Sequence, residues 1–238
     1  MGLKTHLPVR PLTDGSGLVI VTGGGGCPWI VDPERPHLGG NFDGGDLGTW
    51  YKEDLWPWLV ENFVTRTMVD VGCGTGETMR WFTGRGVEAG GIEGLPWNIA
   101  RCNERGPEKV VLHDFRDGVY KIERVDLMWC ADVAEHIDEE YVDGFIETLA
   151  QCNILAMCQG GVENAEEGWH HVNNKPGAYW VKKLKAVGMV EDAQLTAKSR
   201  ELGNHGWWEN TGRIYVRTKE VPPTKIKKKT TKAAAKKG

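Results

Sequence analysis

Hydrophobic residues recur along the chain in short runs, and stretches with helical spacing separate these runs. Five apolar runs have the length of strands and lie at 67–71, 87–92, 109–112, 125–130 and 154–157. Between the fourth and fifth runs, apolar residues recur every four positions over 141–150, which predicts an amphipathic helix. Short apolar strands that alternate with helices are typical of a parallel sheet covered on both faces. The pattern therefore predicts an α/β fold.

The same pattern extends beyond these five strands. A helix is expected over 50–63, with Pro57 interrupting it, and another over 176–187. Two later segments, 190–198 and 213–217, alternate apolar and polar residues as half-buried strands do. We therefore expect one α/β domain over residues 49–220.

The two ends of the chain differ from this middle part. Residues 1–48 are rich in Gly and Pro, with Gly23–Gly26 as the extreme case, and predict a loop-rich arm. Seven lysines and no acid follow from Lys225 onward. Because the whole chain carries a net charge of −4 and these lysines contribute +7, the remainder carries −11. An acidic body disfavours extended duplex binding. Residues 221–238 predict a disordered basic tail that makes at most a weak contact with nucleic acid.

Cysteine usage and targeting signals bear on where the protein works. None of the six cysteines forms a C-x-x-C pair, so neither a zinc finger nor a thioredoxin-type site is indicated. The chain begins without an apolar signal-peptide region, and no apolar run approaches the roughly 20 residues that cross a bilayer. We therefore expect a cytoplasmic protein in a reducing compartment, with no membrane partner.

The strongest local signal is a glycine-rich turn after the first strand. Asp70 lies in this strand, and Gly72, Cys73, Gly74 and Gly76 follow before a helix begins near Glu77. Glycines let the backbone approach a ligand closely, and free N–H groups at the start of a helix face that ligand. A Gly-x-Gly-x-Gly turn is weak evidence alone, but its place between strand and helix makes it a candidate ligand site.

Acidic residues follow the other strands of the predicted sheet. Glu93 and Gly94 end the second strand, and Glu93 lies 23 residues after Asp70. An acid about 20 residues after the first strand commonly binds a ribose diol in doubly wound folds. Asp114 and Phe115 end the third strand, where the acid could accept from an adenine amino group and the ring could line the base pocket. Asp132 follows the fourth. Open α/β sheets bind ligands at these carboxyl ends.

This arrangement resembles the class I S-adenosylmethionine-dependent methyltransferases. Their motifs are matched by Val69-Asp70-Val71-Gly72-Cys73-Gly74-Thr75-Gly76, by Glu93 and Asp114, and by Cys130-Ala131-Asp132-Val133-Ala134-Glu135-His136-Ile137. The chain is also similar to small bacterial and phage methyltransferase-domain proteins. That second resemblance is carried by Gly44-Gly45-Asp46, Thr49-Trp50-Tyr51 and His171-Val172-Asn173.

The resemblance implies a fold, a cofactor and roles for the residues that match. It implies a Rossmann-like, mostly parallel sheet of seven strands, with helices on both faces and the last strand antiparallel. S-adenosyl-L-methionine would be the cofactor. Asp70 and the Gly72–Gly76 turn would hold its methionine part, Glu93 its ribose, and Asp114 with Phe115 its adenine. Asp132 would lie near the reactive sulfonium.

Histidines after the fourth and fifth strands are the candidates for proton transfer. His136, His170 and His171 could act as a general base or contact the methyl acceptor, because the ordinary pKa of histidine is near ~6.5. Each could equally fill a structural role. Neighbouring residues of an extended segment point apart, and the sequence places no third ligand beside His170 and His171. The sequence therefore predicts no metal site.

Two other functions stay open at this point. A nicotinamide-dependent oxidoreductase, binding NAD(P), is the first, although the turn lacks the G-x-G-x-x-G spacing. A non-catalytic module that binds nucleic acid or protein through its tail is the second. The methyl acceptor itself is unidentified. Ala131-Asp132-Val133-Ala134 stands where amino-methylating DNA enzymes carry a Pro-Pro-Tyr/Trp signature, so we favour a small-molecule hydroxyl or amine.

Overall fold

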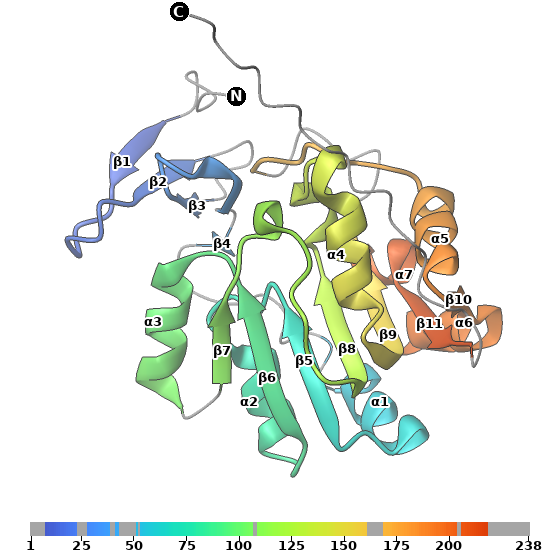
Figure 1. Cartoon of the computed structure of the whole chain (residues 1–238). Helices are drawn as coiled ribbons and strands as arrows, with labels where there is room; N and C mark the ends of the chain where they lie inside the picture. Colours follow the sequence, from blue (N-terminus) through green and yellow to red (C-terminus); the bar gives the residue numbers. More distant parts are fainter. Residues whose placement is uncertain are drawn as a thin grey trace, which may run out of the picture.

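Seven strands form the central sheet of the protein, in the order β10-β11-β9-β8-β5-β6-β7 (Figure 1). The computed structural model describes residues 8–22, 28–38, 41–42, 51, 53–106, 109–160, 169–203 and 206–218. The strands are β5 (Thr67–Val71), β6 (Glu88–Glu93), β7 (Lys109–Leu112), β8 (Val125–Ala131), β9 (Cys152–Cys158), β10 (Met189–Glu191) and β11 (Arg213–Arg217). Neighbouring strands from β7 to β9 pair in parallel, and β11 pairs antiparallel with both β9 and β10. The predicted seven-stranded sheet with its last strand antiparallel is confirmed.

Helices cover both faces of this sheet. They are α1 (Leu55–Phe63), α2 (Glu77–Thr83), α3 (Pro96–Arg105), α4 (Val142–Leu149), α5 (Gly177–Ala186), α6 (Ala193–Gly203) and α7 (Gly206–Thr211). On one face, Phe145 of α4 and Trp180 of α5 are buried in one apolar cluster. On the other face, Trp56 of α1, Phe82 of α2 and Trp208 of α7 are buried in a second cluster. These two layers hold the strand ends in fixed positions.

Large aromatic rings fill the second cluster. The indoles of Trp129 in β8 and Trp208 in α7 stack at 4.5 Å between centroids with an angle of 5° between their planes. The ring of Tyr51 lies 5.2 Å from Trp129. Offset aromatic pairs stabilise a core by about 0.5–1.5 kcal/mol beyond the area that they bury. This packing accounts for several of the 11 tryptophans in the chain.

A second, smaller sheet lies beside the end of the main one (Figure 1). Its strands are β1 (Val9–Pro11), β2 (Val19–Thr22), β3 (Pro28–Val31) and β4 (Asn41–Phe42), paired antiparallel in that order. Ile20 and Ile30 pack with Leu95 at the start of α3, and Trp29 packs with Trp169. The region thus holds more regular structure than its Gly-rich and Pro-rich composition predicts, because both faces of the strands find apolar partners.

The structure corrects several predicted boundaries. The segment 190–198, predicted as a strand, is one only to Glu191, and α6 begins at Ala193. The helix expected from residue 50 begins at Leu55. Residues 23–27, 43–50 and 219–238 lie outside the described residues, and with them the glycine run, most of the Gly44–Tyr51 resemblance and the basic tail. None of the helices in the described part of the chain is long and apolar enough to span a bilayer.

Candidate active site

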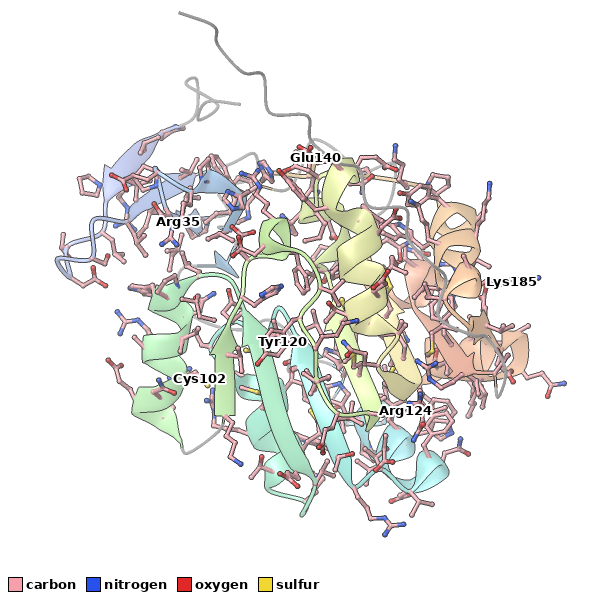
Figure 2. The ribbon with its side chains drawn as sticks, in the orientation of Figure 1. Arg35, Cys102, Tyr120, Arg124, Glu140 and Lys185 are labelled. Atoms are coloured by element: carbon pink, nitrogen blue, oxygen red, sulfur yellow. The ribbon has the colours of Figure 1, made fainter. Side chains whose placement is uncertain are left out.

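The turn between β5 and α2 is built from glycines in the left-handed region. Gly72, Gly74 and Gly76 have φ angles of 74°, 54° and 85°, which side-chain-bearing residues rarely adopt. A Cβ at Gly72 would collide with the side chain of Val133, and one at Gly76 would lie 2.5 Å from Cys102 Sγ of α3 (Figure 2). The turn can therefore take this shape only with bare backbone.

Glu93, at the end of β6, holds this turn in place. Its Oε2 accepts from the Gly74 N–H at 2.9 Å, and its Oε1 accepts from the Leu95 N–H at 2.8 Å. Burial raises the pKa of Glu93, and these hydrogen bonds together with one from Asn98 offset part of that rise. A carboxylate oxygen can accept more than one hydrogen bond, so Glu93 keeps capacity for a ligand hydroxyl.

Asp70 and Cys73 lie beneath the turn. Asp70 is buried in β5 beside Gly91 of β6 and Trp129 of β8. The Cys73 side chain packs with Met79 and Cys102, and its backbone is tied into the turn: the Cys73 N–H donates to the Ile92 carbonyl at 3.3 Å and the Gly76 N–H donates to the Cys73 carbonyl at 2.9 Å. Because the thiol points into the core, Cys73 would contribute to a cofactor site only by shaping the backbone of the turn.

Asp114, at the end of β7, is held by a residue from the N-terminal region. His37 Nε2 lies 2.7 Å from Asp114 Oδ2, and the Arg116 N–H donates to Oδ1 at 2.9 Å. Partial burial would raise the pKa of Asp114, but these hydrogen bonds outweigh it and the pKa is lowered. Leu38 covers Gly94, where a Cβ would lie 2.7 Å from Leu38 Cδ2. The small sheet thus covers the ends of β6 and β7.

Phe115 faces the core. It is 9% exposed, and its ring lies 5.0 Å from Phe145 of α4 in an edge-on arrangement. The packing gives Phe115 a structural role in the core, and its place in a base pocket stays a prediction.

Asp132 follows β8 with a left-handed φ of 55°. Cys158 Sγ lies 3.6 Å from its Oδ1. Its side chain is exposed to solvent, yet protein surrounds it closely enough that desolvation raises its pKa to about 6. The exposed area leaves the carboxylate within reach of a ligand. Asp132 is thus an accessible acid at the carboxyl end of the central strand.

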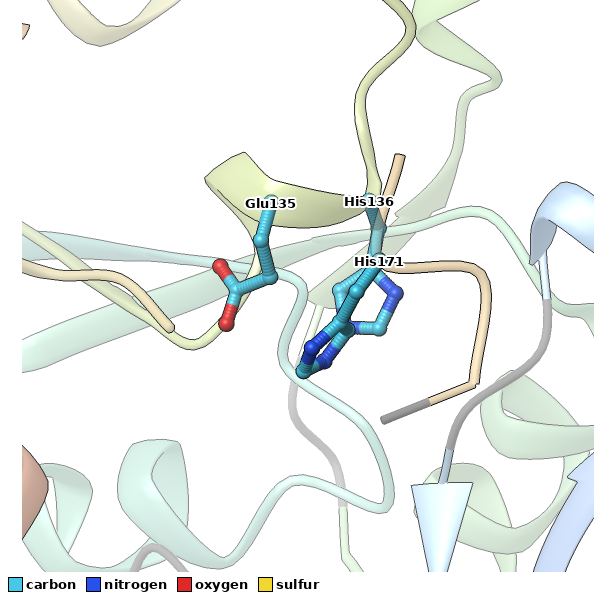
Figure 3. Close-up of side chains that lie close together, drawn as sticks. All are labelled: Glu135, His136 and His171. Atoms are coloured by element: carbon cyan, nitrogen blue, oxygen red, sulfur yellow. The ribbon is translucent and has the colours of Figure 1, made fainter. Parts of the chain in front are cut away.

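Glu135, His136 and His171 come together in the loops after β8 and β9 (Figure 3). Their nearest carboxylate and imidazole atoms all lie within 4.8 Å of one another. Burial, with the charge of Asp132, raises the pKa of Glu135 to about 8. Burial, with the charges of His171 and His170, lowers the pKa of His136 to about 3. His136 is therefore neutral at pH 7 and a weak proton acceptor, which disfavours the predicted role as general base.

His170 and His171 point apart, as the sequence predicts. His171 packs against His136 with 4.9 Å between ring centroids. His170 instead lies 3.9 Å from Asp138 Oδ1, and its ring is 6.5 Å from that of His37. Only His171 joins the cluster with Glu135, so the two histidines have separate surroundings.

Sequence reasoning assigns no role to His37 or Glu135. Glu135 directly precedes the candidate His136 in the loop after the fourth strand, and this adjacency in sequence could have identified it as a site residue. No signal in the sequence pointed to His37, because its contact with Asp114 depends on how the small sheet packs. The approach of Glu135 and His136 to His171, which brings three possible metal ligands together, likewise depends on the three-dimensional structure.

Comparison with known proteins identifies a domain and a fold. Residues 69–152 match the family model of the methyltransferase domain. A TehB-like S-adenosylmethionine-dependent methyltransferase from Corynebacterium glutamicum aligns with a TM-score of 0.55 and 13% identity, over 74% of this chain and 90% of that one. The PH0226 protein from Pyrococcus horikoshii aligns with a TM-score of 0.54 and 14% identity, over 74% and 93%.

A third structure was solved with a product of methyl transfer bound. The plantazolicin methyltransferase BpumL, in complex with a pentazolic desmethyl analogue and S-adenosylhomocysteine, aligns with a TM-score of 0.51 and 10% identity, over 71% of this chain and 83% of that one. No curated protein matches the sequence. The residues matched by the family model include the glycine turn, Glu93, Asp114 and Asp132. They lie on the sheet with the strand order given above. The chain therefore carries a methyltransferase domain, on a fold that it shares with these S-adenosylmethionine-dependent methyltransferases.

Proposed function

We propose that this methyltransferase binds S-adenosylmethionine across the carboxyl ends of β5, β6, β7 and β8 and transfers its methyl group to a small-molecule hydroxyl or amine. The main support for this binding site is the hydrogen bond that the Gly74 N–H donates to Glu93 Oε2 at 2.9 Å. It joins the acid after β6 to the bare turn after β5. Ligands of open α/β sheets bind at these strand ends.

Each part of the cofactor has a candidate partner on the chain. The Gly72–Gly76 backbone, above Asp70, would hold the methionine part, and Glu93 would accept from the ribose hydroxyls. Asp114 would accept from the adenine amino group, with Gly94 beside it. Asp132 would lie near the sulfonium, where an accessible carboxylate attracts a cationic ligand. Phe115 would support the base pocket from the core.

The chemistry needs little covalent help from the protein. When bound, the cofactor supplies an activated methyl group on a sulfonium. The chain would orient the acceptor in line with that methyl and exclude water, and good positioning can lower a barrier by roughly 7–11 kcal/mol. Residues 170–173, after β9, would contact the acceptor. The Val172 and Asn173 N–H groups both donate to the Glu135 carbonyl at 3.0 Å and so hold this segment beside the loop after β8.

Ligand binding and turnover test this proposal separately. Titration of the full chain with S-adenosylhomocysteine, S-adenosylmethionine and NADPH in a calorimeter should give binding of the first two only. Incubation with radiolabelled S-adenosylmethionine and a fractionated extract should label a low-molecular-weight product. Binding of NADPH alone would contradict the cofactor assignment, whereas label found only in protein or nucleic acid would contradict the small-molecule acceptor.

A further inference from the structure

The cluster of Glu135, His136 and His171 has the composition of a transition-metal site. We propose that these three side chains bind one divalent transition-metal ion, such as Zn²⁺ or Fe²⁺, beside the methyl-acceptor position. One carboxylate with two imidazoles is a donor set found with zinc and with non-haem iron. Magnesium and calcium instead prefer sites made wholly of oxygen atoms.

Unpaired polar atoms point to a ligand that the protein alone does not supply. Glu135 is 1% exposed, yet among the residues that the structure describes its Oε2 has no hydrogen-bond partner. Nδ1 of His136 is also buried and has no partner in that part of the chain. A folded protein rarely leaves such buried groups unpaired, because they lose their hydrogen bonds to water and gain none in return. A cation bound between them would satisfy both.

The surroundings hold these donors as metal ligands are usually held. The Gly160 N–H donates to the other oxygen of Glu135, at 2.6 Å. The His136 ring is hydrogen-bonded to the Trp169 backbone. A ligating histidine commonly bonds a backbone carbonyl through its second nitrogen, which fixes the ring. Glu135 and His136 each use one polar atom in a hydrogen bond to the backbone and have a second polar atom that could bind an ion.

Backbone hydrogen bonds bring the third donor into place. Val172 N and Asn173 N donate to the Glu135 carbonyl, and Asn173 Nδ2 donates to the Ile137 carbonyl at 3.0 Å. These bonds fasten the segment after β9 to the loop after β8, and His171 lies at its start. Ligands about 2.0–2.2 Å from one ion are at most roughly 4.4 Å apart. Donor atoms within 4.8 Å therefore need only a small side-chain rotation to coordinate.

A bound ion would favour an oxygen acceptor, and this role rests on the proposed methyl transfer. Coordination lowers the pKa of a bound hydroxyl, which loses its proton to solvent. The oxygen then attacks the methyl carbon, the carbon–sulfur bond breaks, and its electron pair stays on sulfur as a thioether. The products are a methyl ether and S-adenosylhomocysteine. Metal binding itself does not depend on this step.

The test is metal binding by the full chain and two variants. The protein, stripped with chelator, is titrated with Co²⁺, Zn²⁺ and Mg²⁺, and Co²⁺ absorption reports histidine ligation. We expect one Co²⁺ or Zn²⁺ per chain, and we expect His171→Ala and Glu135→Gln each to weaken binding by more than about tenfold, since even outer-shell partners are worth roughly 10–100-fold. His113→Ala is the matched control, because His113 bonds the Gly118 carbonyl outside the cluster.

Parallel titration of each variant with S-adenosylhomocysteine separates this inference from the proposed function. Intact binding of that compound by His171→Ala, together with loss of Co²⁺, supports the metal site and shows that the variant is folded. Less than one ion per chain, binding of Mg²⁺ in preference to Co²⁺, or equal Co²⁺ affinity in wild type and His171→Ala would each overturn it. Failure of S-adenosylhomocysteine to bind the wild type would instead overturn the proposed function.

Discussion

His37 Nε2 lies 2.7 Å from Asp114 Oδ2, although 77 residues separate them in the chain. The contact orients the carboxylate proposed to bind adenine. We expect His37→Ala to weaken S-adenosylhomocysteine binding by about 1 kcal/mol, roughly fivefold in dissociation constant, because an oriented acceptor becomes mobile. Calorimetry measures this change, and Arg35→Ala, in the same connection between β3 and β4, serves as the control. Equal affinity in His37→Ala and wild type would show that the contact does not position Asp114 for the ligand.

Replacement of Glu93 tests the acid after β6. Glu93→Ala leaves two backbone N–H groups unpaired at Gly74 and Leu95, and we expect it to abolish S-adenosylhomocysteine binding. Glu93→Gln keeps a carbonyl oxygen that can accept one of these bonds. It should fold and bind more than about tenfold more weakly than wild type, since a hydrogen bond to a charged group is worth roughly 1.5–3 kcal/mol. Retained affinity in the folded Glu93→Gln protein would count against a ribose contact.

The glycine turn can be tested by strain. Gly74→Val should abolish cofactor binding, because a β-branched residue at a φ of 54° forces the turn open. Gly86→Val is the matched control: Gly86 has a φ of 80°, but nothing lies within 4 Å of its Cβ position. Both variants carry backbone strain, and circular dichroism should show both folded. Similar binding by the two variants would mean that the turn is not the site.

Most strands of the main sheet could be predicted from the sequence because a strand depends on a local pattern of apolar residues. The runs at 109–112 and 213–217 became β7 and β11 with the same bounds. The error at 190–198 has a visible cause. Asp192 Oδ1 accepts from the N–H groups of Gln194 and Leu195 at 3.0 Å each, which caps a helix. An Asp before a helix is a known start signal, and the alternating pattern concealed it.

The candidate site was predictable in part. Gly74 and Glu93 meet as expected because parallel strands end at one edge of the sheet. The contact of His37 with Asp114 and the approach of His171 to Glu135 were not predictable. Both depend on segments that cross the strand ends by tertiary packing, and local spacing carries no information about such crossings.

Asp126 gives the protein an acid-sensitive element. Its Oδ2 accepts from the Arg66 and Thr67 N–H groups and fastens the start of β5 to β8. Partial burial would raise the pKa of Asp126, but these hydrogen bonds outweigh it and the pKa is lowered. The stabilisation is therefore present above the unfolded pKa of about 3.9 and is lost as pH falls through the folded value.

We expect Asp126→Asn to lower the free energy of unfolding by about 1–2 kcal/mol at pH 7, allowing for partial exposure. The difference from wild type should shrink as pH falls below about 4, because the carboxylate of the unfolded chain then takes up a proton and the folded one follows only at lower pH. Urea unfolding at several pH values measures both. A difference that stays constant from pH 7 to pH 3 would show that the charge of Asp126 contributes nothing.

Packing behind the site can be tested at Gly203, the last residue of α6. A Cβ at this position would collide with the ring of Trp208, which is fully buried and stacked on Trp129, so the ring cannot move aside. Gly203→Ala should therefore lower the free energy of unfolding by about 1–3 kcal/mol, even though alanine favours helices. Gly206→Ala, where nothing lies within 4 Å of the Cβ position, should leave stability unchanged or raised. Urea unfolding followed by tryptophan fluorescence compares the two variants. If Gly203→Ala is as stable as Gly206→Ala, then α7 and its tryptophan are not packed against the sheet as the structure places them.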